Sequence, residues 1–197
     1  MSMRGLRPIA EIQYLDYILY ALQILSDDLS TLTYRTHGGQ KAPLIVRTRG
    51  HRLEGIWHSG SPLGGMISFL RGVFILTPRN MTKAAGFYNT LLDIDQPGVV
   101  IEPLNGYRTK EQLPSNYGQF KTPIGEIEIL KEGTDITLVS YGSTFNIVIN
   151  VAKEIEKYGI SCEVIDVQSL IPFDIKKEIS KSVIKTNRLL ILSLIHI

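Results

Sequence analysis

The sequence predicts an α/β protein with two doubly wound parallel-sheet domains. Short β-branched runs alternate with amphipathic stretches between residues 6 and 104. A stretch rich in Gly, Pro, Asn and Gln follows at 105–122 without a sustained apolar period, and a second alternating pattern begins after it. Such alternation is typical of strands joined by helical crossovers, and the interruption predicts a connection between two folded units.

In the first unit, the pattern predicts strands at 7–12, 43–48, 73–77 and 98–103. The clearest helix covers 81–93, where apolar residues recur on one stripe: Met81, Ala84, Ala85, Tyr88, Leu91 and Leu92. Residues 14–25 are a second helix candidate. The stretch from Gly60 to Gly65 predicts a turn or a loop that enters a short helix.

In the second unit, the predicted order of elements is strand 136–141, helix 145–158, strand 160–167, helix 174–184 and strand 188–192. A turn at Gly142-Ser143-Thr144 joins the first strand to its helix. Ile147, Val151 and Ile155 recur at the spacing of one helix face, which we expect to be buried. This order is that of half a doubly wound sheet.

The composition is that of a globular protein, with 44% hydrophobic and 20% charged residues. The net charge of +2 lacks the basic surplus that DNA or RNA binding needs, so no nucleic-acid partner is expected. Apolar runs such as 72–77 are far shorter than the roughly 18 residues of a membrane span. The single cysteine, Cys162, allows no internal disulfide and no paired-cysteine metal motif, and favours a cytoplasmic location.

The last six residues, 192–197, have a separate interpretation. Leu-Ser-Leu-Ile-His-Ile matches the translation of a transposon-end adapter used in sequencing libraries, so we expect these residues to be a sequencing artefact. The alternative is the ordinary apolar end of a strand. On the first interpretation, His196 has no functional role.

Position in the fold gives the first candidate site residues, because the standard motifs for phosphate binding, zinc hydrolysis and serine hydrolysis are absent. Glu11 and Gln13 end an apolar strand, and Tyr14, Asp16 and Tyr17 open the helix that follows. In α/β folds this position faces the ligand. Helix capping and a tyrosine packed on the sheet would explain the same residues.

The segment RTRGHRLEGIWHSGSP contains Arg47, Arg49, His51 and Arg52, followed by Glu54, Trp57 and His58. A solvated loop explains such charge by default, whereas its glycines and the only tryptophan favour a shaped loop over a cavity. His58 is the candidate for catalysis, because histidine exchanges protons near neutral pH without a large pKa shift. A structural histidine is the alternative.

Seven segments together resemble one family: GLRPIAEIQYLDY, WHSGSP, TPRNMTKAAGFYNTLL, VIEPLNGYR, GTDITLVSYGS, SCEVIDVQSLIPFDI and KTNRLLIL. From Gly5 to Ile191 the sequence is similar to the beta part of the thiamine-diphosphate-dependent 2-oxo acid dehydrogenases, the decarboxylating first component of these multienzyme complexes. The similarity is greatest to the branched-chain, 2-oxoisovalerate type, particularly the bacterial form in which the alpha and beta parts are fused.

The resemblance implies a pyrimidine-binding domain at 1–104 that lacks its start, a linker at 105–122, and a transketolase-type C-terminal domain at 123–191 that lacks its end. By position, Gln13 and Tyr17 match residues that line the pocket for the aminopyrimidine ring of thiamine diphosphate. His58 matches the histidine that faces the thiazolium and the substrate, where it positions the substrate and supplies a proton to the leaving dithiol.

The same resemblance implies the partners of this chain. The site for Mg and the diphosphate belongs to the alpha part, and the glutamate that activates the cofactor lies upstream of the first strand, so we expect the fragment alone to be inactive and to hold no metal. The other expected partner is a lipoyl-bearing acyltransferase core, and the expected substrate is 3-methyl-2-oxobutanoate. The expected assembly is a dimer or heterotetramer, and no membrane is expected as a partner. Pyruvate, acetoin and transketolase-like substrates are alternatives, and a noncatalytic fragment or assembly module is the alternative function.

Overall fold

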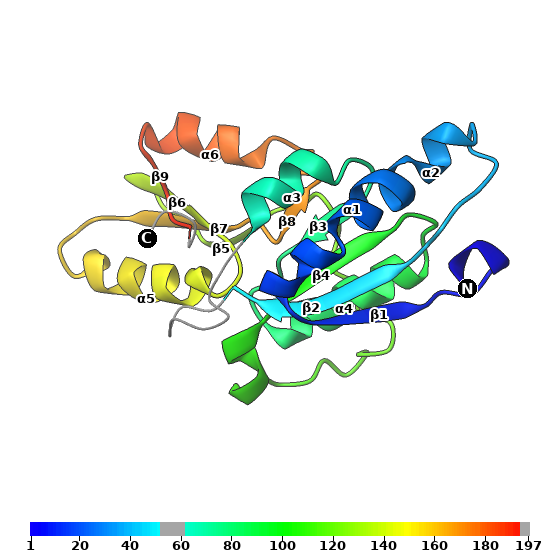
Figure 1. The fold of residues 1–197 in the computed structure, drawn as a ribbon. Helices are drawn as coiled ribbons and strands as arrows, with labels where there is room; N and C mark the ends of the chain where they lie inside the picture. The colour runs from blue at the N-terminus through cyan, green and yellow to red at the C-terminus, as the bar shows by residue number, and fades with distance from the viewer. Residues whose placement is uncertain (52–61, 194–197) are drawn as a thin grey trace.

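The computed structural model describes residues 1–51 and 62–193 and contains two sheets (Figure 1). The first sheet has the strand order β1-β2-β4-β3-β8, and the second has the order β5-β7-β6-β9. β8 and β5 run antiparallel to their neighbours, whereas all the other strand pairs are parallel. The α/β prediction is confirmed, but the two antiparallel strands make both sheets mixed.

The first sheet is centred on β4 (Gly98–Pro103), whose residues are all buried. Such a strand is covered on both faces and therefore carries a continuous apolar run rather than an alternating one. The remaining strands of this sheet are β1 (Ile9–Tyr14), β2 (Ile45–Gly50), β3 (Phe74–Leu76) and β8 (Ser169–Ile171). The predicted positions of β1 to β4 were correct to within two residues at each end.

Alternate residues of β4 face two different cores. Val99 and Ile101 pack with helical residues that include Leu15, Ile18 and Met66. Val100 packs on the opposite face with Phe87 and Leu91 of α4 (Met81–Leu92). Helices thus cover both faces of the first sheet, as a doubly wound fold requires (Figure 1).

The helix predicted at 14–25 is longer and less regular than expected. A helical segment, with one turn residue at Ala21, runs through η2 (Leu15–Tyr20), α1 (Leu22–Ile24), the π-helical η3 (Leu25–Leu29) and α2 (Ser30–Arg35). The Ser30 hydroxyl donates to the Leu25 carbonyl at 2.6 Å, and such bonding to the preceding turn disturbs regular helix geometry. The second half of this segment is rich in polar residues and lacks a clear apolar pattern, so the sequence did not predict it as helix. α3 (Leu63–Phe69) is the short helix expected after the loop.

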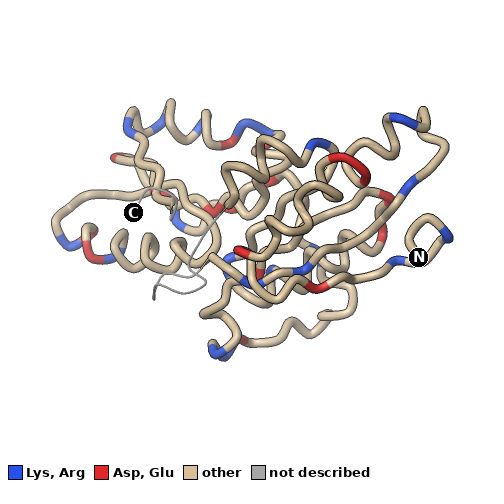
Figure 2. The backbone as a smooth tube through the Cα atoms, in the orientation of Figure 1, with Lys and Arg blue, Asp and Glu red and all other residues tan. Residues whose placement is uncertain are grey.

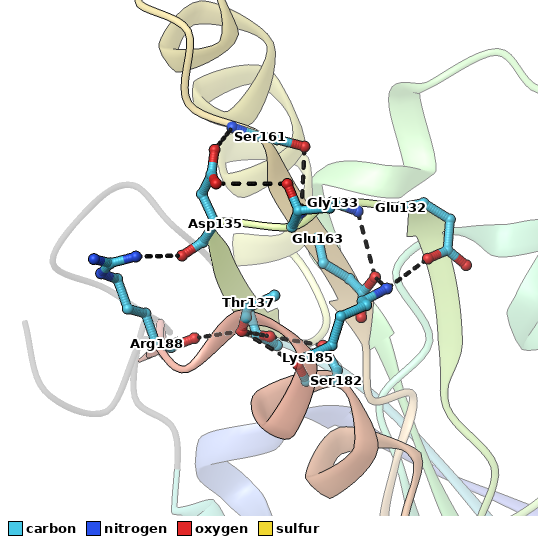
Figure 3. A network of polar contacts seen from close by, with 11 residues as sticks. Glu132, Gly133, Asp135, Thr137, Ser161, Glu163, Ser182, Lys185 and Arg188 are labelled. Carbon is cyan, nitrogen blue, oxygen red and sulfur yellow. Dashed lines mark hydrogen bonds and ion pairs between the residues drawn. The ribbon is translucent and has the colours of Figure 1, made fainter.

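In the second sheet, Thr137 and α6 (Glu178–Thr186) are joined by hydroxyl groups (Figure 3). The Thr137 hydroxyl lies 2.6 Å from that of Ser182 and 2.7 Å from that of Thr186. Lys185 of α6 also reaches Glu132 at 2.8 Å and the buried Glu163. The strands are β5 (Glu128–Lys131), β6 (Ile136–Ser140), β7 (Cys162–Asp166) and β9 (Leu189–Ile191), and α5 (Thr144–Glu156) covers the other face.

The predicted buried face of α5 was correct for Ile155, which is partly buried against the core, and wrong for Ile147 and Val151. Ile147 and Val151 are 47% and 45% exposed, whereas Phe145, Val148 and Ala152 are buried. Phe145 has the largest side chain of the helix and enters the core with Leu138 and Val164, so it sets the rotation of α5 on the sheet. Cys162 also lies in this core.

The stretch 105–122 begins inside the 3-10 helix η4 (Leu104–Arg108) and then runs along α4. Side chains of α4 hold its backbone: the Asn89 amide donates to the carbonyls of Tyr117 and Phe120 at 2.9 and 2.8 Å. The Thr90 hydroxyl donates to the Thr122 carbonyl at 2.8 Å. Most of this stretch is exposed, but it is fixed to the first unit.

Candidate functional site

Gln13 lies at an irregularity near the carboxyl end of β1. The strand pairs Ile12 with Thr48 and Tyr14 with Arg49, so Gln13 is the extra residue between them. A bulge of this kind redirects a side chain and is frequent beside active sites. Gln13 is exposed there, and Tyr17 of η2, which follows directly, is 41% exposed.

Arg49 and Tyr14 hold this end of the strand pair together. The Arg49 guanidinium lies 4.7 Å from the centre of the Tyr14 ring, and its Nε donates to the Gln13 carbonyl at 3.0 Å. The rings of Tyr14 and Tyr17 meet edge to face with centres 5.9 Å apart. The structure therefore places Gln13 and Tyr17 near the same end of β1, where Tyr14 contacts the Tyr17 ring and Arg49 bonds to the Gln13 backbone.

Gly50 ends β2 directly beside this cluster. A Cβ at this position would lie 2.4 Å from the Cβ of Leu15, so only glycine lets the end of β2 approach the start of η2. Gly50 therefore packs directly against the first residue of η2, the helix that also contains Tyr17.

Glu102 near the end of β4 is the centre of a second cluster, which the sequence prediction missed. This residue is 2% exposed and accepts from Arg47 at 2.8 Å, from the Tyr88 hydroxyl at 2.6 Å and from the Tyr107 hydroxyl. The carboxylate raises the pKa of Arg47, while burial and the same carboxylate raise the pKa of Tyr88. A glutamate directly after the apolar run VVI was the signal that could have identified it. With Ile9, Glu11, Arg47 and Tyr88, it lines a cavity of about 410 Å³.

A third polar cluster lies where the carboxyl ends of β2 and β3 meet those of β6 and β7. His51, which follows β2, is 1% exposed, and its Nδ1 accepts from the Ser143 N–H of the second unit at 3.0 Å. Gly142 allows this contact, because a Cβ there would lie 2.5 Å from the same nitrogen. Burial lowers the pKa of His51 to about 4. The sequence grouped His51 with the basic residues Arg47, Arg49 and Arg52. In the structure it is instead a buried, neutral residue at the interface between the two units.

Arg79, just after β3, joins the same two units through charge. Its Nη1 lies 2.7 Å from Asp166 and 2.6 Å from Glu128, both on strands of the second sheet. Lys83 also contacts Glu128, at 2.8 Å. Burial raises the pKa of Asp166 to about 7, against the opposing effect of Arg79. Elsewhere in the described chain, basic and acidic residues are interspersed (Figure 2).

His58 and its neighbours Arg52, Glu54 and Trp57 lie outside the described residues. Within 1–51 and 62–193, no three His, Cys, Asp or Glu side chains gather in a way that could hold a metal ion. No helix in these two ranges is long and apolar enough to cross a membrane.

Comparison with known proteins gives one family match and many similar chains. Residues 125–193 match the family described as "Transketolase, C-terminal domain". The chain is 35% identical over 192 residues to the mitochondrial 2-oxoisovalerate dehydrogenase subunit beta of Chaetomium thermophilum, an alignment that covers 93% of this chain and 40% of that protein. It is 30% identical over 195 residues to the pyruvate dehydrogenase E1 component subunit beta of Acholeplasma laidlawii, covering 98% of this chain and 59% of that protein. The chain thus spans about half the length of the curated relatives it matches.

Solved structures share the fold. A structure described as "Split gene transketolase, inactive beta4 tetramer" has a TM-score of 0.78 at 20% identity, over 96% of this chain and 57% of that chain. A transketolase mutant from Pichia stipitis has a TM-score of 0.67 at 15% identity, over 94% of this chain and 26% of that chain. At these identities the structures support the arrangement of strands and helices.

Proposed function

Because this chain is homologous to the beta subunits of 2-oxo acid dehydrogenases, we propose that it serves as the beta part of a thiamine-diphosphate-dependent enzyme of this kind. The proposed substrate is a branched-chain 2-oxo acid, 3-methyl-2-oxobutanoate, and the proposed product is an acyl group on a lipoyl carrier. The observation that carries this proposal is the 35% identity over 93% of the chain to a 2-oxoisovalerate dehydrogenase subunit beta.

The side chains at the end of β1 fit the aminopyrimidine ring of the cofactor. Such a ring needs an aromatic or apolar surface to pack against and a partner for its polar nitrogens. The Tyr17 ring is partly exposed and offers the surface, and the exposed Gln13 amide offers both a donor and an acceptor. We therefore assign the binding of the pyrimidine ring to these two residues, within a pyrimidine-binding domain at 1–104.

Thiamine diphosphate, when bound, supplies the electron sink that decarboxylation of a 2-oxo acid requires. His58 is proposed to position the substrate and to hold the proton that the lipoyl dithiol receives, because a histidine transfers protons readily near neutral pH. Arg49 keeps Gln13 in place through its bond to the Gln13 carbonyl, and this contact orients the pocket.

The proposed assembly is a dimer or heterotetramer with an alpha part, fused or separate, that binds Mg and the diphosphate. A lipoyl-bearing acyltransferase core is the proposed acceptor, in the cytoplasm. The chain spans only about half of its relatives, so these partners are assigned to the whole enzyme.

The decisive experiment uses the full-length protein with its alpha part. Lipoamide-dependent turnover is measured with 3-methyl-2-oxobutanoate, pyruvate and acetoin, for the wild type, His58→Ala and the control His37→Ala. His37 is an exposed histidine of the first unit. The proposal expects turnover that His58→Ala abolishes and His37→Ala preserves, and a higher kcat/KM for the branched-chain acid. Full turnover in His58→Ala contradicts the catalytic assignment.

Pyruvate is the second candidate substrate, because the chain is 30% identical over 195 residues to a pyruvate dehydrogenase E1 component subunit beta. A higher kcat/KM for pyruvate in the same experiment would select it, and one for acetoin would select an acetoin-type enzyme. Absence of turnover with all three, in a folded complex that contains the alpha part, would favour a noncatalytic assembly module.

A further inference from the structure

The irregularity in β1 sets the direction of the Tyr14 side chain. The strand pair matches Ile12 with Thr48 and Tyr14 with Arg49, so β1 advances by two residues where β2 advances by one. Successive side chains of a regular strand point to opposite faces of the sheet. Without the extra residue Gln13, Tyr14 would therefore share a face with Ile12, which packs against a buried apolar cluster. The irregularity turns Tyr14 to the other face, directly opposite Arg49.

Arg49 holds the Tyr14 ring from the side of β2, the strand that lies beside β1 (Figure 1). Its guanidinium carbon lies 4.7 Å from the centre of the ring, within the range of a cation–π contact. Its Nε donates to the Gln13 carbonyl at 3.0 Å. One guanidinium thus contacts both the ring of Tyr14 and the backbone of the residue that turns this ring.

The Tyr14 ring in turn contacts Tyr17, the proposed surface for the aminopyrimidine ring. The two ring centres lie 5.9 Å apart and the ring planes meet at 88°, which is the favoured edge-to-face arrangement. Tyr17 is 41% exposed, so the protein covers only part of its ring. A side chain that must become ordered when a ligand binds lowers the affinity for that ligand. The contact with Tyr14 orders the Tyr17 ring before any ligand arrives.

The polar cluster around Glu102 gives Arg49 a fixed neighbour on the side of β4. The Tyr107 ring lies 6.0 Å from the Arg49 guanidinium carbon. The Tyr107 hydroxyl donates to the buried Glu102 and accepts from Arg47 at 3.0 Å, so two contacts fix this ring. A set of contacts therefore leads from the end of β4 across β2 to Tyr17.

We infer that Tyr14 and Arg49 are positioning residues for the cofactor ring. Arg49 fixes the Tyr14 ring, and the Tyr14 ring fixes the orientation of Tyr17. This inference rests on the proposed function, in which Tyr17 packs against the aminopyrimidine ring of thiamine diphosphate. Because both residues act through Tyr17, their effect on cofactor affinity depends on the presence of the Tyr17 ring.

The test replaces each positioning residue in two backgrounds, the wild type and Tyr17→Ala, in the full-length protein with its alpha part. Tyr14→Leu removes the aromatic ring, and Arg49→Met removes the guanidinium but keeps an apolar side chain. Thiamine diphosphate is titrated by calorimetry in the presence of Mg. Each replacement is expected to weaken cofactor binding about three- to tenfold in the wild type and less than about 1.5-fold in Tyr17→Ala.

Tyr34→Leu and Arg35→Met are the matched controls, because they remove the same two groups from exposed positions of α2, at the other end of the helical segment from Tyr17. Both controls should leave the affinity unchanged. Arg49→Lys keeps the charge but loses the Nε donor and the planar group, so its loss should be smaller than that of Arg49→Met and should also disappear in Tyr17→Ala.

Equal losses in the two backgrounds would show that Tyr14 and Arg49 only stabilise the fold, and this result overturns the inference. Unchanged affinity in the wild-type background overturns it as well, and both results leave the proposed function intact. If Tyr14→Leu and Arg49→Met do not fold, the same two results for Arg49→Lys have the same meaning. A wild-type complex that binds no thiamine diphosphate overturns the inference together with the proposed function.

Discussion

Tyr17 and Gln13 show what position alone can tell about a residue. Their placement after an apolar run put them at the end of a strand, and they do lie at the end of β1 and in the first turn after it. The bulge that exposes Gln13 could not be predicted, because it depends on the pairing of β1 with β2 and not on β1 itself. Their role in binding the cofactor stays a prediction.

Replacing Tyr17 with alanine is expected to weaken thiamine diphosphate binding in the full-length enzyme by roughly tenfold, because the aromatic surface is lost. A titration of cofactor followed by tryptophan fluorescence measures this. Tyr20→Ala is the control: Tyr20 belongs to the same 3-10 helix but is 90% exposed. Equal affinities for Tyr17→Ala and the wild type would remove Tyr17 from the site.

His51 makes the stability of the protein sensitive to acid. Its pKa is about 4 in the folded state and 6.5 in its unperturbed form, so the unfolded chain takes up the proton first as pH falls. Between pH 6.5 and 4 the wild type should lose about 3 kcal/mol more stability than His51→Asn, whose asparagine tolerates the positive φ of 53°. Urea unfolding of both proteins across this range measures the difference. Parallel pH curves would show that His51 does not titrate in this way.

At the scale of elements, the sequence identified those with an internal apolar pattern and missed those defined by a neighbour. β4 was predicted at 98–103 and lies at Gly98–Pro103, because a strand buried on both faces carries its own signal. β5 and β8 were missed, because both are short and antiparallel and are strands only through their pairing with β7 and β3. The rotation of α5 was missed because the cavity that receives Phe145 is formed by other strands.

Two helical glycines should respond to alanine in opposite ways. A Cβ on Gly86 of α4 would lie 2.2 Å from the Thr122 hydroxyl and 2.8 Å from the Thr122 nitrogen, so Gly86→Ala should cost about 1–3 kcal/mol. A Cβ on Gly64 of α3 meets nothing within 4 Å, so Gly64→Ala should add about 0.5–1 kcal/mol. Thermal unfolding of both variants tests this. A gain in Gly86→Ala would show that 120–122 moves away from α4 freely.

At the scale of the whole molecule, the two units are joined through buried polar groups. His51 reaches Ser143 across the interface, and Arg79 reaches Asp166. The sequence contained these residues but gave no sign of their pairing, because the partners are 92 and 87 positions apart. The contacts of this interface form only when the two units fold together, so no local sequence pattern predicts them.

Arg79→Ala should destabilise the protein by about 3 kcal/mol, because it leaves the buried Asp166 without its cation. The loss should grow as pH rises above about 7, because Asp166 of the wild type then ionises beside Arg79, whereas the variant lacks this cation and its folded state must keep the carboxyl protonated. Lys83→Ala is the control and should cost less than about 1 kcal/mol, because its partner Glu128 is 36% exposed. Denaturant unfolding at several pH values measures both. Equal losses in the free energy of unfolding for the two variants would show that the contact between Arg79 and Asp166 does not stabilise the protein more than the contact between Lys83 and Glu128.

β8 comes from the second unit but completes the first sheet beside β3, pairing Leu76 with Ser169. The ribosome must therefore add more than ninety residues after β3 before β8 can pair with it. During that part of synthesis the β3 edge of the first sheet is unpaired, and other chains can pair with it. Cleavage of the exposed stretch 105–122 should leave two pieces that stay together, held by a strand that one piece contributes to the sheet of the other. The two units are thus separate along the chain but form one folding unit.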